Sequence, residues 1–97
     1  MAAFVIADVD VKDPDKFKEY SKLTPNILKT YGGRYLVRGG NVEVVEGTWT
    51  PNRLVVMEFE SIAQLKRWYN SPDYTDALKI RQGSSESNVI VAEGVES

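Results

Sequence analysis

The residues of this chain best suited to chemistry on a small anion are a glutamate inside an apolar run and two arginines beside apolar positions. Glu58 has the same parity as Leu54 and Val56, so its carboxylate is expected to face a covered side of a strand. A lone carboxylate there is costly without a partner. Arg81 lies on the apolar stripe of a predicted helix, and Arg38 ends an earlier strand-like run. These two guanidinium groups are the candidate partners.

These residues have two competing interpretations. In the first, Glu58 and Arg81 are the catalytic residues of a pocket. Arg38 and Arg81 hold an anionic or carbonyl group there, while Glu58 acts as a base or orients an arginine. Tyr69 and Tyr74 add hydroxyl groups and ring walls that contact the ligand. In the second, Glu58 and an arginine form a structural ion pair that fixes strand register, and the tyrosines close the core.

The two tryptophans are the remaining candidates for ligand contact. Trp49 lies in a predicted loop beside Pro51, where it can stack on a ligand, contact a partner subunit or cover a sheet edge. Trp68 lies three residues after Leu65 on a helical stripe. That spacing is typical of a core residue, with a ligand-lining role as the alternative.

Two absences exclude whole classes of chemistry. The 97 residues contain no histidine and no cysteine. Ser-His-Asp catalysis, an imidazole base, thiolate nucleophiles and the commonest ligands of zinc, copper and haem are therefore excluded. Acidic neighbours such as Asp8 and Asp10 lack the spacing of a calcium loop, and the glycine pairs match no phosphate-binding motif. We expect no cofactor and no metal site; tyrosine ligation of a haem has no supporting cluster.

Charge and hydropathy restrict the partners. Twelve basic and fourteen acidic residues give a net charge of −2 without a basic block, so no nucleic-acid partner is expected. No apolar stretch approaches the roughly 20 residues needed to cross a bilayer. The first residues lack the basic region and cleavage site of a signal peptide. The sequence thus predicts no membrane partner and a cytoplasmic location.

The length and composition suit one globular domain over residues 1–97. Apolar residues make up 42% and charged residues 27% of the chain, a balance that predicts folding rather than disorder. A chain of this size buries roughly two-thirds of its unfolded surface, which suffices for a single core.

The first part of the chain predicts a strand followed by a helix. Residues 3–10 are apolar on both parities, which is typical of a central strand covered on both faces. Asp13 then caps a helix that ends at the pair Gly32-Gly33. Pro25 interrupts the helical pattern, and it predicts either a kink or a restart with Thr24 as a new cap.

Further strands and helices follow. Residues 34–38 and 42–46 are β-prone runs that form either a tight hairpin or one bulged strand. The nearly continuous apolar run 54–59 predicts the second central strand. Helices are expected after the capping residues Ser61 and Ser71. The residues that follow Ser61 fit a capping box, and a proline at the first helical position follows Ser71. The last strand is predicted at residues 88–93.

This order of elements favours an α+β, ferredoxin-like βαββαβ fold, an antiparallel sheet with its helices on one face. The opposite face would then be bare and largely apolar, a patch larger than monomers usually expose. Two copies that pair their sheets face to face would cover it, so we expect a homodimer. The alternative is a monomer in which the valines on the bare face of the sheet are simply tolerated at the surface.

Several stretches together carry a family resemblance. They are residues 31–40, 46–49 with Pro51, 53–56, 58–59 and 68–72, followed by Tyr74 and Arg81. Through them the chain resembles the domain-of-unknown-function family DUF1330 of the dimeric α/β barrel superfamily. Glu60 departs from the family pattern, which has proline there, but it touches no candidate chemistry.

The resemblance implies a ferredoxin-like fold that dimerises through its sheets, with a cleft between sheet and helices in each subunit. It implies no established activity. Related families include cofactor-independent monooxygenases, isomerases and haem-degrading enzymes, but a shared fold does not carry function over. We therefore expect a homodimer that binds a small anionic or carbonyl-containing molecule in that cleft, with a cofactor-independent enzyme as one form of this function. The alternative is a non-enzymatic structural or regulatory dimerisation module.

Overall fold

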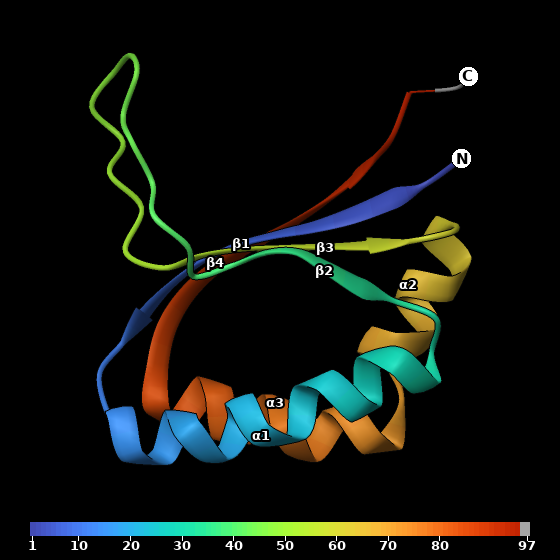
Figure 1. The fold of residues 1–97 in the computed structure, drawn as a ribbon. Coiled ribbons are helices and arrows are strands. Elements are labelled where there is room, and N and C mark those ends of the chain that lie inside the picture. Colours follow the sequence, from blue (N-terminus) through green and yellow to red (C-terminus); the bar gives the residue numbers. More distant parts are fainter. Residues whose placement is uncertain (96–97) are drawn as a thin grey trace.

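A four-stranded antiparallel sheet carries three helices on one face in the computed structural model, which describes residues 1–95 (Figure 1). The strand order β2-β3-β1-β4 is that of the predicted ferredoxin-like fold. Residues 96 and 97 of the predicted domain lie outside the described residues. The elements are, in chain order, β1 (Ala3–Val11), α1 (Pro14–Thr30), β2 (Arg34–Arg38), β3 (Leu54–Phe59), α2 (Ile62–Tyr69), α3 (Pro72–Ser84) and β4 (Ser85–Glu93).

The helix α1 runs without a break through Pro25, so the predicted restart at this residue is wrong. Thr24 does not cap a new helix, because its hydroxyl donates to the backbone carbonyl of Tyr20 at 2.7 Å. Pro25 has no N–H, and the carbonyl of Ser21, four residues earlier, therefore lacks its helical partner. No helix in the described part of the chain is both long and apolar enough to cross a membrane.

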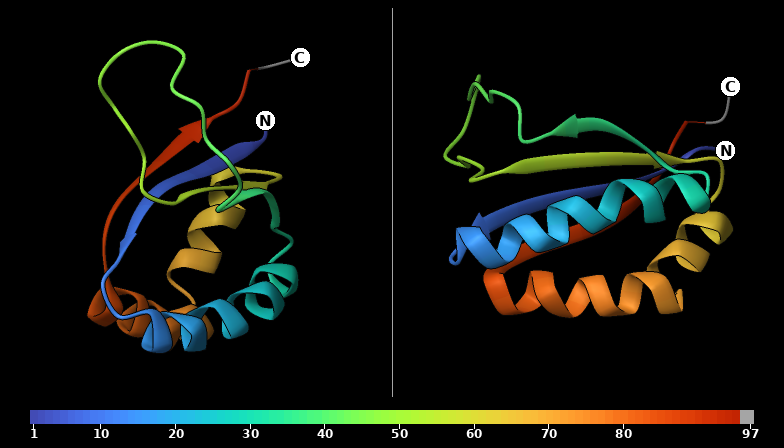
Figure 2. Two further views of the ribbon diagram at one scale, coloured as in Figure 1. Left: turned by 60° about the vertical axis from the view of Figure 1, so that its left-hand side comes forward. Right: turned by 60° about the horizontal axis from the view of Figure 1, so that its bottom comes forward.

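Residues 39–53 form one long loop, which differs from both predictions for the run 42–46. The run has no strand beside it, because β2 pairs with β3 alone and its ladder ends at Arg38. The only irregularity in this ladder lies inside β2, between Tyr35 and Val37. Figures 1 and 2 show the loop standing on the side of the sheet away from the helices.

Two sets of hydrogen bonds hold the base of this loop. The N–H of Gly39 donates to the carbonyl of Leu54 at 2.8 Å. The carboxylate of Asp8 on β1 accepts from the indole of Trp49 at 3.1 Å and from the backbone N–H of Asn52 at 2.8 Å. These two hydrogen bonds lower the pKa of Asp8, that of Trp49 most. Asp8 thus ties the loop to the outer side of the sheet.

The core lies between the sheet and the helices, because every second residue of the strands points toward the helices. In β1 these residues are small or β-branched; Ala3, Val5, Ala7 and Val9 are buried, and Val11 at the end is partly buried. The intervening side chains point to the outer face, where helices do not cover them, so β1 is covered on one face only within the protomer. The buried hydrophobic residues are Ala3, Val5, Ala7, Val9, Phe17, Tyr20, Leu28, Met57, Phe59, Leu65, Trp68, Tyr74 and Ala77.

The strand β4 starts at Ser85, three residues earlier than predicted from its apolar pattern. It pairs with β1 along its whole length, from Val11 opposite Ser85 to Ala3 opposite Glu93. Backbone pairing does not need apolar side chains at the start of β4, so the apolar pattern alone underestimated the strand.

We predict that Gly33→Ala destabilises the fold, because a Cβ there would lie 2.5 Å from Leu28 Cδ1 and 2.6 Å from Phe59 Cε1. Overpacking of this kind should lower the free energy of unfolding by about 1–3 kcal/mol, measured by urea denaturation. Gly40→Ala is the matched control, since no heavy atom lies within 4 Å of its added Cβ. It should change stability by less than about 0.5 kcal/mol. Equal losses in both variants would contradict the packing described for Gly33.

Candidate functional site

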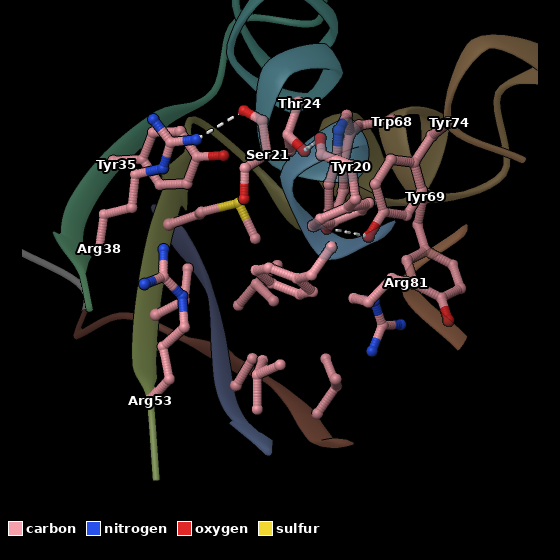
Figure 3. Close-up of a pocket in the computed structure, with 17 residues that line it drawn as sticks. Tyr20, Ser21, Thr24, Tyr35, Arg38, Arg53, Trp68, Tyr69, Tyr74 and Arg81 are labelled. Carbon is pink, nitrogen blue, oxygen red and sulfur yellow. Dashed lines mark hydrogen bonds between the residues drawn. The ribbon is translucent and has the colours of Figure 1, made fainter. Parts of the chain in front are cut away.

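A pocket lies between the helix-facing side of the sheet and the three helices (Figure 3). The space in it that water centres can reach is about 40 Å³, room for a few water molecules. It shares Tyr69, Arg81 and Val89 with an open groove of about 280 Å³. A ligand larger than the pocket can therefore extend along β4. The sheet contributes Val5, Ala7, Val9, Tyr35, Arg38, Val55, Met57 and Val89, the long loop contributes Arg53, and the helices contribute Phe17, Tyr20, Ser21, Thr24, Trp68, Tyr69, Tyr74 and Arg81.

The pocket is lined by positive charge without a compensating acid. Arg38, Arg53 and Arg81 all contribute to it, whereas no aspartate or glutamate of residues 1–95 does. Arg81 is only 7% exposed. No carboxylate of the described chain lies within ion-pair distance of its guanidinium. A buried cation of this kind is costly unless something else supplies a counter-charge.

The position of Arg38 follows from a proline in the neighbouring helix. Its guanidinium donates to the carbonyl of Ser21 at 2.7 Å, as Figure 3 shows. That carbonyl is the one left without a helical partner by Pro25. The guanidinium also lies 4.6 Å from the centroid of the Tyr35 ring, a cation–π distance. Pro25 thus helps to hold an arginine at the pocket, although it lies outside the pocket itself.

Arg53 enters the pocket from the other stem of the long loop. Its guanidinium carbon lies 5.6 Å from the centroid of the Phe17 ring. Its Nε is buried and has no acceptor within residues 1–95. Gly39, with a φ of +69°, lies so close to this guanidinium that a Cβ would collide with it. A residue with a side chain would be disfavoured at Gly39 by the backbone conformation, and it would displace the guanidinium of Arg53.

Two tyrosine hydroxyls meet inside the pocket wall. The hydroxyl groups of Tyr20 and Tyr74 lie 2.8 Å apart and are buried. Burial raises the pKa of Tyr20 strongly, and it also raises the pKa of Tyr74, where the hydrogen bond with Tyr20 and the charge of Arg81 act in the opposite direction. Burial also raises the pKa of Tyr35. These hydroxyls therefore stay protonated near neutral pH.

Trp68 stacks against this tyrosine pair. Its ring centroid lies 4.2 Å from that of Tyr74 and 5.3 Å from that of Phe59. The indole Nε1 is buried and, like Arg53 Nε, finds no acceptor in the described part of the chain. Trp68 is therefore a core residue that also lines the pocket.

Five of the seven residues predicted to form a site line this pocket, namely Arg38, Trp68, Tyr69, Tyr74 and Arg81. Their spacing in the sequence did not show that they meet, since they come from β2, α2 and α3. Their roles in binding or catalysis stay predictions.

Glu58 lies on the opposite side of the sheet, so its predicted pairing with Arg38 or Arg81 is wrong. Its neighbours Met57 and Phe59 point toward the helices, which directs Glu58 outward. The register places Arg34 directly opposite Glu58, and Arg34 Nε donates to Glu58 Oε1 at 2.6 Å. The resulting ion pair is partly solvent-exposed, with 23% of the Glu58 side chain accessible.

Trp49 does not line the pocket. It is 61% exposed in the long loop, and its indole donates to Asp8 at the outer side of the sheet. This hydrogen bond to a sheet residue favours the alternatives in which Trp49 packs on the sheet or on a partner subunit over the alternative in which it stacks on a ligand. Contact with a partner subunit remains a prediction.

Sequence reasoning missed Arg53, Tyr20 and Tyr35 as pocket residues. Arg53 lies two residues before Val55 and four before Met57. Because alternate residues of a strand face the same side, extending the pattern of β3 backwards would have predicted that Arg53 faces the pocket. Tyr20 lies on the apolar stripe of α1, where a pocket wall and a core residue look alike. Within residues 1–95 no three acidic side chains gather as a metal site would require. The polar side-chain groups that line the pocket are guanidinium and hydroxyl groups.

A family model described as "Domain of unknown function (DUF1330)" matches residues 2–95, which confirms the family resemblance. A search of curated proteins finds no match.

Solved structures with the same fold have low sequence identity. A protein of unknown function, RPA0582 from Rhodopseudomonas palustris, superposes with a TM-score of 0.80 at 16% identity, over 99% of this chain and 84% of that one. A dimeric ferredoxin-like protein of unknown function from Jannaschia sp. CCS1 gives 0.74 at 12% identity, over 97% and 100%. SnoaB, a cofactor-independent oxygenase from Streptomyces nogalater, gives 0.64 at 13% identity, over 99% and 94%. At these identities the likeness establishes the fold alone.

We predict that the protein loses stability as the pH rises above about 10, the ordinary pKa of tyrosine. The unfolded chain ionises there, while burial keeps Tyr20 and Tyr74 protonated in the folded state. The stability they contribute is complete below that pH and falls as the pH rises, by up to about 1.4 kcal/mol per pH unit for each group. Tyr20→Phe should flatten this dependence, as measured by urea denaturation between about pH 8 and about pH 11.

Phe17→Leu is the control for this prediction, because Phe17 packs 5.4 Å from the Tyr20 ring and does not titrate. It should lower stability by a similar amount at every pH and keep the slope of the wild type. A Tyr20→Phe variant with the wild-type slope would show that Tyr20 ionises equally in both states.

Proposed function

The chain belongs to the DUF1330 family, whose function is unknown, and from its pocket we propose that the protein binds a small anionic molecule between its sheet and helices. One observation carries the proposal: Arg81 lines the pocket, is only 7% exposed as a residue, and has no carboxylate partner among residues 1–95. Arg38 and Arg53 add two further cations to the same pocket. A ligand carboxylate or other anion would supply the missing counter-charge.

The energetic argument favours a bound anion over an empty pocket. The effective penalty for burying a cation is several kcal/mol, and a structural role for Arg81 would need a partner that offsets it. A carboxylate offsets it well, because it accepts two parallel N–H bonds from a guanidinium. The surrounding rings of Phe17 and Tyr74 lower the local dielectric constant and strengthen this interaction.

A cofactor-independent reaction on the bound molecule is the enzymatic form of this proposal. Arg81 would stabilise negative charge that develops on a ligand oxygen. Glu58, the candidate base of the sequence analysis, lies on the other face beside Arg34, so its proposed role is structural. Proton transfer would instead involve Tyr20 or Tyr74, whose hydroxyl pKa values are both influenced by the charge of Arg81. The oxygenase SnoaB shares the fold, and we treat that as support for the reaction class alone.

We further propose that two copies pair through the outer face of the sheet. Phe4, Ile6 and Val56 form an apolar band there that is only half-buried, and Ile90 extends it onto β4 with 60% of its surface exposed. A second copy of the same face would cover this band. The neighbour from Jannaschia is described as dimeric, and so are others of this fold.

This outer face also supports the second candidate function, a non-enzymatic dimerisation module. In that case the pairing of two sheets would be the whole function, and the arginines would serve the fold. The two candidates differ in what they require of Arg81, which makes that residue the place to test them. A cytoplasmic location stays a prediction from the sequence.

We expect acetate and benzoate to raise the melting temperature of the protein by several degrees at concentrations well above their dissociation constants. Acetamide and benzamide, which lack the charge, should not. Arg81→Met should weaken binding of the anions by about tenfold or more, because it removes a charge-assisted hydrogen bond. Without ligand the variant should be as stable as the wild type or more stable, since a buried unpaired charge is gone.

Arg67→Met is the matched control, because Arg67 lies exposed on α2 and outside the pocket. It should bind both anions as the wild type does, at equal ionic strength. The proposal would be overturned by anions that leave the wild type unchanged, or by equal binding to wild type and Arg81→Met.

For the dimer, we predict that Ile90→Lys gives a folded monomer in sedimentation at micromolar concentration while the wild type sediments as a dimer. The substitution places a charge on the outer face, and the exposure of Ile90 within one protomer should leave the fold intact. Leu23→Lys, at an exposed apolar position of α1, should stay dimeric. A monomeric wild type, or a dimeric Ile90→Lys, would refute pairing through this face.

A further inference from the structure

The long loop, residues 39–53, carries a cluster of exposed apolar side chains, and we call this loop the arm. Val42, Val44, Val45 and Trp49 are all exposed, and Val45 keeps 91% of its surface accessible. A single apolar residue at a protein surface is ordinary, but a cluster of them is typical of an interaction site. Nothing in the described part of the chain covers these side chains.

The main chain of the arm is also without partners. Within residues 1–95, no main-chain group of residues 40–51 forms a hydrogen bond with another main-chain group. The valines of the arm are β-prone, because a β-branched side chain packs well on a pleated surface. A β-prone run whose main chain and side chains are both uncovered is suited to docking on another chain.

The arm projects from the side of the sheet away from the helices. Figures 1 and 2 show that it rises beyond the outer face instead of lying flat on it. The second copy that we propose on the outer face would occupy the space on this same side. The arm must then lie against that copy when the two sheets pair.

Asp8 joins the arm to the apolar band of the outer face. Its carboxylate accepts from the indole of Trp49 and from the N–H of Asn52. Ile6 faces the same side of β1 as Asp8 and lies about 7 Å along the strand from it. Trp49 therefore extends the band of Phe4 and Ile6 toward the arm. A second copy that covers the band reaches the base of the arm.

The charges of the arm favour a protein as its partner. Glu43 and Glu46 are the only charged residues among residues 39–52. An acidic segment is repelled by the phosphates of a nucleic acid and by an anionic lipid surface. Several structures of this fold are described as dimeric, which favours a second copy of this chain as the partner.

We infer that the arm of each protomer clasps the second copy, with Val42, Val44 and Val45 packed against the partner subunit. This inference rests on the proposed pairing through the outer face and names the element that completes the interface. In a two-fold dimer the contact forms twice, because each copy offers one arm and receives the other. Apolar contact between two sheets is non-directional, so the two arms fix how the sheets are oriented on each other.

Val45→Asp should weaken the dimer without unfolding the protomer, because the side chain of Val45 is exposed within one copy. The dissociation constant measured by sedimentation equilibrium should rise about a hundredfold, since a charge is buried at each of two equal contacts. Leu23→Asp is the matched control at an exposed apolar position of α1, and it should dimerise as the wild type does. Circular dichroism checks that both variants keep the fold.

A second measurement locates the arm directly. The chain has no cysteine, so Glu43→Cys gives a unique site for a nitroxide label on the arm and leaves its valines unaltered. Mixed dimers are formed from the labelled variant and isotope-labelled wild type. The nitroxide should broaden backbone amide signals of the isotope-labelled copy in the nuclear magnetic resonance spectrum. A nitroxide at Leu23→Cys, on the helix side, should not.

The outcomes separate this inference from the proposed pairing. If the wild type is a dimer and Val45→Asp dimerises equally well, the clasp is overturned and pairing through the sheet stands. The same holds if a nitroxide on the arm broadens no signal of the other copy. A wild type that stays monomeric at micromolar concentration would overturn both.

Discussion

The alternation of side chains across the sheet is the constraint on which the rest of the structure depends. Successive residues of a strand point to opposite faces, and in β1 this puts Val5 and Ala7 under the helices and Ile6 on the outer face. The same rule directs Arg53 into the pocket and Glu58 away from it. A shift of one residue in the register of β3 would exchange the two.

The pocket depends on a second constraint, the satisfaction of backbone groups in α1. Pro25 stays within the helix, and its cost is one carbonyl, that of Ser21, without a partner. Arg38 donates to that carbonyl and stays at the pocket. Arg53, on the other stem of the loop, packs against Gly39, which directly follows Arg38. Local backbone chemistry thus positions two of the three arginines that the proposed function requires.

The two faces of the sheet divide the proposed roles. The covered face holds a cationic pocket with buried donors, and the outer face presents an apolar band with the Arg34–Glu58 ion pair on it. Because the strands are shared, a second copy on the outer face would also restrain the strands that carry Arg38 and Arg53. Assembly and ligand binding are therefore proposed on opposite sides of one structural layer.

Most of the fold could be predicted from local sequence patterns, because capping residues and hydrophobic periodicity act over a few neighbours. The caps Asp13, Ser61 and Ser71 and the apolar runs of β1 and β3 are examples. Local patterns failed for the run 42–46, which has strand-forming residues but no neighbouring strand. A strand needs a hydrogen-bonding partner, and the sequence of one segment does not say whether a partner is present.

The sequence by itself determined the element order, the chemistry that missing histidine and cysteine exclude, and most of the residue types in the pocket. The tertiary structure alone decided which charges meet. Glu58 pairs with Arg34 rather than Arg81, because strand register brings residues together that are 24 positions apart. Arg81 remains without a partner carboxylate in the described chain for the same reason: the fold, and not spacing along the chain, sets the distances on which electrostatic interactions depend.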